Sequence, residues 1–209
     1  MKLARIALTP PIAAISVSLF VALGAQAETY RLVEYLESTG VQSVDTGVMP
    51  TAGDVITVDV LSSVKDKTVI GAQSASANRT QIYQSNDASP KLGYCACRKD
   101  GAGVLGFPQN EQRRLVLDLP AAKAWAGRSS SAVTVGTTVP KVNYWLFAEN
   151  VNGKRTSPMT GRIYLCRIDN AEKRHTLCPC VMVDGETETP GFYDAAEKTF
   201  CRGRRPAPR

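Results

Sequence analysis

The chain contains a single histidine, His175, among 209 residues. Hydrolytic zinc sites commonly use two or more histidine ligands, so the lack of a second histidine argues against a zinc hydrolase. A Ser-His-Asp triad would rest entirely on His175, which stands in the charged stretch "DNAEKRH". We expect that stretch to form the turn of a β-hairpin.

The sequence also lacks the repeated carboxylates of two other hydrolase classes. An aspartic protease needs two Asp-Thr-Gly carboxylates in one site, and Asp45 in "SVDTGV" begins the only such motif here. A retaining glycosidase places two carboxylates about 5 Å apart, and no Glu-x-Asp-x-x-Glu string occurs. Glu34 and Glu37 would face opposite sides of a strand. Glu186 and Glu188 stand in "DGETE", which its Gly and Pro neighbours mark as a loop. We therefore predict a protein without catalytic machinery.

The first residues have the features of a secretory signal peptide. Lys2 and Arg5 precede an uncharged stretch, 6–27, that closes on Ala-Gln-Ala. A basic start, a short apolar run and this cleavage pattern predict a signal peptide over 1–27. Cleavage there would leave 182 residues and lower the formal net charge from +6 to +4. No later stretch is apolar enough to span a bilayer, so we expect an exported protein. The periplasm, the cell surface and the extracellular space all remain open.

The last residues, 202–209, form a basic tail rich in Pro and Arg. Such a terminus is typical of a solvated, disordered end. No known nucleic-acid motif accompanies the charge, so we expect no nucleic-acid partner.

Between these ends the sequence predicts one strand after another. In "DVITVDV" the residues Ile56, Val58 and Val60 share one face, which is the period-two pattern of a half-buried strand. Similar short runs occur at 67–71, 80–84, 91–97, 113–119, 131–138, 142–148, 162–168 and 177–183. Clusters of Gly, Pro, Asn, Ser and Asp separate them, including "DGAGVLGFPQN", and indicate turns and loops. Short strands at this spacing predict a single all-β domain over 28–201, either a sandwich or a barrel.

Three segments carry a more specific pattern: "YRLVEYLESTGVQSVDTGVMPTAGDVITVDV" at 30–60, "NYWLFAENVNGKRTSPMTGRIYLCRI" at 143–168 and "CPCVMVDGETETPGFYDAAEKTF" at 178–200. They resemble, in order, three family segments: L-E-Y-I-E-S-T-G-T-Q-Y-I-D-T-G, the loop N-L-Y-L-F-A-R-N with the strand K-I-Y-S-C-K-I, and P-C-x…G-L-Y-D…K-F. The family is the concanavalin A-like lectin/glucanase superfamily, in the LamG-like jelly-roll form of bacterial surface and phage-associated proteins. The middle of the chain, 72–140, is not aligned with it.

The resemblance implies an all-β fold of two packed antiparallel sheets, a jelly-roll sandwich. It also implies that Asp-Thr-Gly ends an early strand and enters a turn. There Asp45 would bond its own backbone and Gly47 would supply a positive φ.

Six cysteines, an even number in a chain expected to be exported, predict disulfides among Cys95, Cys97, Cys166, Cys178, Cys180 and Cys201. If the hairpin joining 162–168 to 177–183 is centred near Glu172, Cys166 faces Cys178, and a slip of register brings it near Cys180. A Cys-x-Cys pair on one strand is too far apart to close on itself, so the first such pair should bond elsewhere, with Cys201 as a candidate. The alternative is a zinc site built from both Cys-x-Cys pairs, although structural zinc prefers Cys-x₂-Cys spacing.

Exported sandwiches of this kind often bind glycans or proteins, with aromatic rings on sugar faces and polar side chains on hydroxyls, which is an analogy of fold. The candidates here are Trp125, Tyr83, Tyr94, Asn86, Asp87 and Asn150. Trp125 stands between small residues in "AKAWAGR" and is a better candidate for exposure than Trp145, whose apolar run "YWLF" is typical of a core. Calcium occurs in related folds, but no acidic cluster with ligand spacing stands out, so no metal or cofactor is predicted.

We therefore expect an exported, non-catalytic binding module that recognises a glycan or a surface protein. A structural or assembly module of a cell-surface complex is the first alternative. A glycoside hydrolase with an unrecognised carboxylate arrangement is the second. The oligomeric state is left open.

Overall fold

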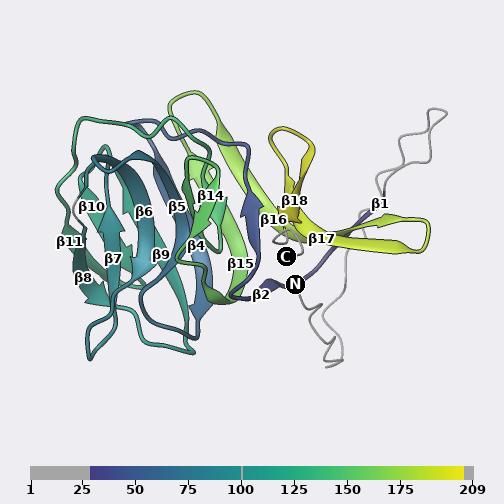
Figure 1. Ribbon diagram of the computed structural model, residues 1–209, viewed down its shortest axis with the longest axis horizontal. Coiled ribbons are helices and arrows are strands. Elements are labelled where there is room, and N and C mark those ends of the chain that lie inside the picture. The colour runs from purple at the N-terminus through teal and green to yellow at the C-terminus, as the bar shows by residue number, and fades with distance from the viewer. Residues whose placement is uncertain (1–28, 100, 205–209) are drawn as a thin grey trace.

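The computed structural model describes residues 29–99 and 101–204, so the predicted signal peptide and residues 205–209 of the basic tail lie outside the described residues. The described chain forms eighteen β-strands and no helix (Figure 1). It therefore contains no helix long and apolar enough to cross a bilayer. The strands are β1 (Thr29–Leu32), β2 (Leu36–Thr39), β3 (Ser43–Asp45), β4 (Val55–Ser62), β5 (Lys67–Ala75), β6 (Asn78–Gln84), β7 (Lys91–Cys95), β8 (Ala102–Gly106), β9 (Gln112–Asp118), β10 (Lys123–Ala126), β11 (Ser129–Ala132), β12 (Trp145–Leu146), β13 (Glu149–Val151), β14 (Lys154–Thr156), β15 (Thr160–Asp169), β16 (Arg174–Asp184), β17 (Thr187–Asp194) and β18 (Thr199–Arg204).

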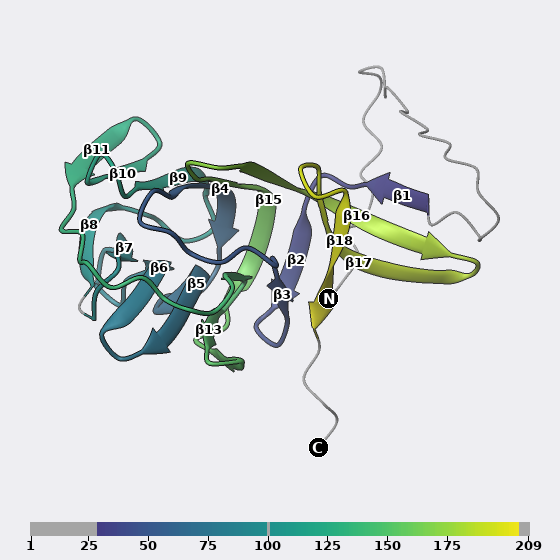
Figure 2. The same cartoon turned by 90° about the horizontal axis from the view of Figure 1, so that it is seen from above.

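The strands pair in two sets that share β18. The first set runs in the antiparallel order β11, β10, β9, β4, β15, β16, β17 and β18, with β2 beside the start of β15 and β1 beside the end of β16. The second set runs β18, β3, β12, β5, β6, β7 and β8, with β13 parallel to β5 and β14 beside β13. Because β18 pairs with β17 and also with β3, the two sets form one large sheet that is nearly barrel-shaped. Figure 2 shows β4, β9 and β15 on one side of the molecule and β5, β6 and β7 on the other.

The core lies between these two sets of strands. On β4 the side chains of Ile56, Val58 and Val60 are fully buried and their neighbours are partly exposed, which confirms the predicted alternation. Ile70 of β5 and Ile82 of β6 belong to the same cluster of buried side chains. Both sets of strands therefore contribute buried side chains to one hydrophobic core.

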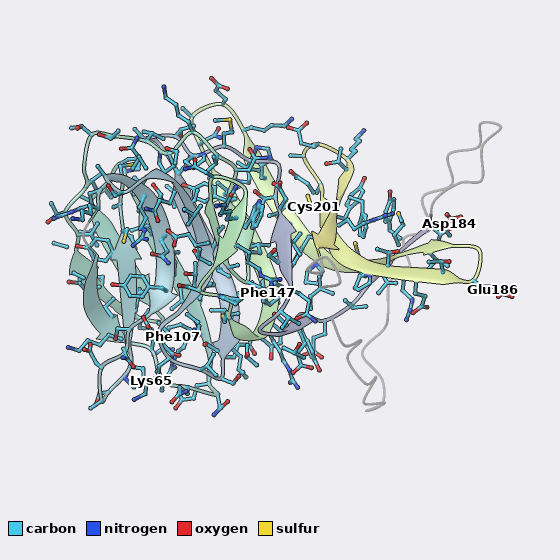
Figure 3. The ribbon with its side chains drawn as sticks, in the orientation of Figure 1. Lys65, Phe107, Phe147, Asp184, Glu186 and Cys201 are labelled. Atoms are coloured by element: carbon cyan, nitrogen blue, oxygen red, sulfur yellow. The ribbon has the colours of Figure 1, made fainter. Side chains whose placement is uncertain are left out.

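The hairpin of β16 and β17 projects from the body of the molecule (Figure 1). Asp184 and Glu186 lie at its tip (Figure 3). Within the exposed stretch "DGETE", Gly185 and Glu186 form the turn, whereas Glu188 lies in β17 and forms an ion pair of 2.7 Å with Arg31. β18 continues through Arg204, so the first residues of the predicted basic tail belong to the sheet.

The predicted disulfides are absent, because all six cysteines are free thiols. In the hairpin of β15 and β16, Cys166 lies opposite Leu177, and Asp169 lies opposite Arg174. The side chain of Cys178 therefore points to the other face of the sheet, away from Cys166. In the described part of the chain no three His, Cys, Asp or Glu side chains are grouped so that they could hold a metal ion, so the two Cys-x-Cys pairs do not form a zinc site.

Candidate functional site

A small pocket of about 230 Å³ lies on the face of β5, β6 and β7 that points away from the core. It is below the range of about 300–1,000 Å³ that is usual for drug-sized ligands, so it suits one small unit. Ten residues line it: Asp66, Lys67, Thr68, Arg79, Gln81, Tyr83, Cys95, Gly101, Glu149 and Ser157.

The alternation of β6 supplies three of these side chains. Arg79, Gln81 and Tyr83 follow one another at every second position, so they share the outer face of the strand. Glycines on the neighbouring strands make room for them. A Cβ atom at Gly93 would lie 2.3 Å from the Tyr83 ring, and one at Gly71 would lie 3.2 Å from the side chain of Gln81. Small residues on β5 and β7 therefore allow large polar side chains to lie flat on the sheet.

A reversal of the backbone brings Glu149 to the same face. Trp145 pairs with Gly71 in an antiparallel ladder, and Glu149 pairs with the same glycine in a parallel one. Phe147, between them, has a φ of 63°, a left-handed conformation that is rare for a bulky residue. Its amide donates a hydrogen bond of 2.9 Å to the carbonyl of Val69, and its ring is fully buried. Strain at one residue, held by the packing around it, thus places a carboxylate in the pocket.

The carboxylate of Glu149 is held by two neighbours. Its side chain is 3% exposed, and Oε1 lies 2.7 Å from Nε of Arg79. The hydroxyl of Thr156 donates to Oε2 at 3.2 Å. Burial raises the pKa of Glu149, and the guanidinium of Arg79 opposes this rise.

One oxygen of this carboxylate has no hydrogen-bond partner. Nε of Arg79 donates to Oε1 of Gln73 at 3.0 Å, so its single hydrogen is not directed at Glu149. The contact between Arg79 and Glu149 Oε1 is therefore an ion pair without hydrogen-bond geometry. Among the described residues, Oε1 of Glu149 accepts no hydrogen bond although it is buried. A buried carboxylate oxygen without a hydrogen-bond partner is an exception among buried polar atoms, and it calls for a donor.

Cys95 and Tyr83 complete the polar wall of the pocket. Burial raises the pKa of the Cys95 thiol to about 11, and burial also raises the pKa of Tyr83. Both groups are therefore protonated at neutral pH. A thiol with so high a pKa is a poor nucleophile. Its sulfur donates a weak contact of 3.7 Å to Oε1 of Gln81.

The six side chains that the sequence suggested for ligand binding do not lie together in the structure. Tyr83 lines the pocket. Tyr94 is buried, and its hydroxyl accepts a hydrogen bond of 3.0 Å from the amide of Thr134. Asn150 is also buried, with Nδ2 donating to the carbonyl of Asn143 at 2.9 Å, so it holds the loop around it.

The other three candidates lie away from the pocket. Asn86 and Asp87 are exposed in the loop between β6 and β7, where Asp87 accepts a hydrogen bond of 3.0 Å from the hydroxyl of Ser85. Trp125 is partly exposed on the outer face of β10, in the other set of strands. The tyrosine and the tryptophan therefore cannot contact one ligand unit together.

Asp45 and His175, two titratable residues that the sequence brought to attention, have structural roles. Asp45 accepts hydrogen bonds from the amide of Gly47 at 3.0 Å and from Nδ2 of Asn143 at 3.1 Å, and Gly47 has a φ of 72°. The expected turn at Asp-Thr-Gly is confirmed. His175 is buried, and its Nδ1 lies 2.7 Å from Oδ2 of the buried Asp194.

Sequence reasoning missed Arg79, Gln81 and Glu149 as members of a site. The available signal was Glu149 itself, a carboxylate placed directly after the apolar run "YWLFA". A charged residue that continues a buried run is rarely solvated, so it marks a paired group. No protein-family model matches the chain, and a search of curated proteins finds no relative.

Proposed function

We propose that the chain is an exported, non-catalytic binding module of the concanavalin A-like, two-sheet jelly-roll type, and that its pocket holds one neutral, hydroxyl-bearing unit of a glycan. The all-β architecture and the three resembling segments support the fold. The unpartnered Oε1 of Glu149 on the wall of a pocket is the single observation that supports the binding role.

The charges of the pocket favour a neutral ligand. Arg79 and Lys67 carry positive charge, and Glu149 and Asp66 carry negative charge, so the lining has no excess of either sign. A sugar hydroxyl can donate to Oε1 of Glu149 and accept from other groups in the same unit. Tyr83 adds the one aromatic surface among the lining residues, and aromatic rings pack against the apolar faces of sugars.

Binding rather than hydrolysis is proposed because the lining holds one buried carboxylate, whereas glycoside hydrolysis uses a pair of carboxyl groups. Both oxygens of Glu149 lie against Arg79, and Thr156 also donates to Oε2. Asp66, the other carboxylate of the lining, is exposed. A hydrolysis assay on neutral polysaccharides tests this directly, and turnover that Glu149→Gln abolishes would replace the binding proposal by a glycosidase.

A glycan array of neutral and acidic glycans identifies the ligand, and calorimetry on the strongest neutral hit measures its affinity. Glu149→Gln preserves shape but replaces a charge-assisted hydrogen bond by a neutral one, so we expect the affinity to fall about fivefold to tenfold. Glu172→Gln, the same change at an exposed hairpin position, is the matched control and should leave the affinity within twofold. Equal effects of both substitutions, or no neutral hit on the array, would exclude the pocket as a glycan site.

A second function, as an assembly module for another protein chain, is favoured by the projecting hairpin of β16 and β17. β1 pairs with β16 along this arm, and its Leu32 is 68% exposed. The projecting arm leaves this apolar side chain accessible to a partner chain. Analytical ultracentrifugation of the wild type and Leu32→Ser tests this function, which requires association that the substitution weakens.

A further inference from the structure

Trp125 lies in a row of side chains that crosses the outer face of the first set of strands. The register places Trp125 opposite Val116 of β9 and Ser130 of β11. Val116 lies opposite Thr57 of β4, and Thr57 lies opposite Arg167 of β15. Because neighbouring strands are about 4.8 Å apart, Trp125 and Arg167 are separated by about 14 Å. Trp125 and Arg167 are thus the two largest side chains of this stretch of the row, with Val116 and Thr57 between them.

This Trp125–Arg167 strip faces away from the core. Trp125, Val116, Thr57 and Arg167 are all partly exposed, whereas the residues that alternate with them on β4 and β9 are buried. The small side chains in the middle leave the strip flat between the indole and the guanidinium. A flat strip with an aromatic ring at one end suits an extended chain laid across the strands rather than a compact ligand.

The charge on the strip is uncompensated at Arg167. The neighbouring carboxylates already have partners: Asp59 binds Arg114 with two hydrogen bonds of 2.8 Å, and Asp169 pairs with Arg174 at 3.0 Å. Among the described residues, no carboxylate forms an ion pair with Arg167, and its Nε is buried without a hydrogen-bond partner.

Two more charged residues lie next to the strip. Lys123 lies beside Trp125 on β10 and faces Asp118 across the β9–β10 pair. Of the four residues of the strip, Arg167 alone is charged, and its planar guanidinium matches a carboxylate.

We propose that the Trp125–Arg167 strip binds a linear polysaccharide that carries carboxylate groups. A sugar ring packs on the indole of Trp125, and a carboxylate further along the chain pairs with Arg167. The pocket at Glu149 lies on the other set of strands, so this second site is independent of it. A protein with both sites can hold two different glycans at once.

Binding of size-defined oligogalacturonate, measured by calorimetry at low salt, tests the strip. We expect Trp125→Ala and Arg167→Gln each to weaken binding at least tenfold, and Trp125→Tyr to retain part of the affinity. Lys154→Gln removes an exposed positive charge from β14 in the other set of strands and should change the affinity less than twofold. A neutral cello-oligosaccharide of the same length should bind at least tenfold more weakly than the oligogalacturonate.

Three results would overturn the proposal. The first is the absence of saturable oligogalacturonate binding by the wild type. The second is an equal loss with Lys154→Gln and Arg167→Gln, which would show attraction by net charge alone. The third is a Trp125→Tyr variant that melts at the wild-type temperature but binds as weakly as Trp125→Ala. In all three cases the affinity of the wild type and of Glu149→Gln for the neutral glycan reports on the pocket separately.

Discussion

Replacement of Arg79 by methionine should destabilise the protein strongly at neutral pH. Arg79 is the only cation within ion-pair distance of Glu149 among the described residues, and the Glu149 side chain is 3% exposed. Removal of one partner from a buried pair costs about 3–5 kcal/mol because the other charge is left uncompensated. The Arg79 side chain retains 29% exposure, and Thr156 still donates to the carboxylate, so we expect about 2–3 kcal/mol.

The cost of this substitution should depend on pH with a definite sign. Burial raises the folded-state pKa of Glu149 above its ordinary value of 4.5, and loss of Arg79 should raise it further. A carboxyl with a raised folded-state pKa destabilises the fold at pH values above that pKa. The penalty is relieved as the pH falls through the folded-state pKa toward the unfolded one. The difference between Arg79→Met and the wild type should therefore be largest near pH 7.5 and should shrink toward pH 5.

Urea unfolding of both proteins at pH 7.5 and pH 5.0 gives the two differences in free energy. Arg114→Met is the matched control, because it removes the same charge from an ion pair with Asp59 in which the arginine side chain is 63% exposed. Such a surface pair contributes less than about 1 kcal/mol. The reasoning about Glu149 is refuted if Arg79→Met costs no more than Arg114→Met at pH 7.5, or if its cost is the same at both pH values.

Three further perturbations test the packing. Tyr144→Phe should cost about 1–3 kcal/mol in urea unfolding, because the tyrosine hydroxyl donates at 2.8 Å to the buried Asp54, and a neutral effect would contradict this role. Gly93→Ala should lower the melting temperature and displace Tyr83, whereas Gly106→Ala, where no atom lies within 4 Å of the added Cβ, should be tolerated. Without reductant, a thiol reagent should modify six cysteines after unfolding, but in the native protein only the partly exposed Cys178 should react readily. Fewer than six thiols after unfolding would show that disulfides form.

The parts of the fold that depend on local alternation were predictable from the sequence. The buried face of β4 follows from period two alone, and so does the assignment of an all-β chain. The stretch "DGAGVLGFPQN" was wrongly interpreted as a loop, since it contains β8, which exists because it pairs with β7. The predicted strand at 131–138 ends at Ala132. Beyond Ala132 the chain forms isolated backbone hydrogen bonds with other segments, such as the one from the amide of Gly136 to the carbonyl of Ala96.

The error in the cysteine pairing has a specific cause. The turn between β15 and β16 holds four residues, 170–173, and Oδ1 of Asn170 accepts hydrogen bonds from the amides of Glu172 and Lys173. The hairpin is therefore centred half a residue earlier than Glu172. That changes the pairing by one residue, so Cys166 meets Leu177 and Cys178 points to the opposite face. Sequence patterns rarely determine a register this closely, because both registers bury apolar side chains.

The position of Glu149 could not be predicted, because it depends on a conformation that the sequence disfavours. Alternation along 142–148 predicts that either Trp145 and Phe147 or Tyr144 and Leu146 are buried, and the structure buries all four. Leu146 and Trp145 lie on a strand that is paired on both sides, with β3 and β5, and the chain then reverses at Phe147, which has a left-handed φ. The surrounding core offsets the strain of this φ, because the amide of Phe147 donates a hydrogen bond to the carbonyl of Val69 and its ring is fully buried. Glycine accepts this φ without strain but would forfeit the buried ring, so Phe147→Gly should cost less than Phe147→Ala while both lose core packing. An alanine variant that unfolds at a higher urea concentration than the glycine variant would contradict the strain inferred at this position.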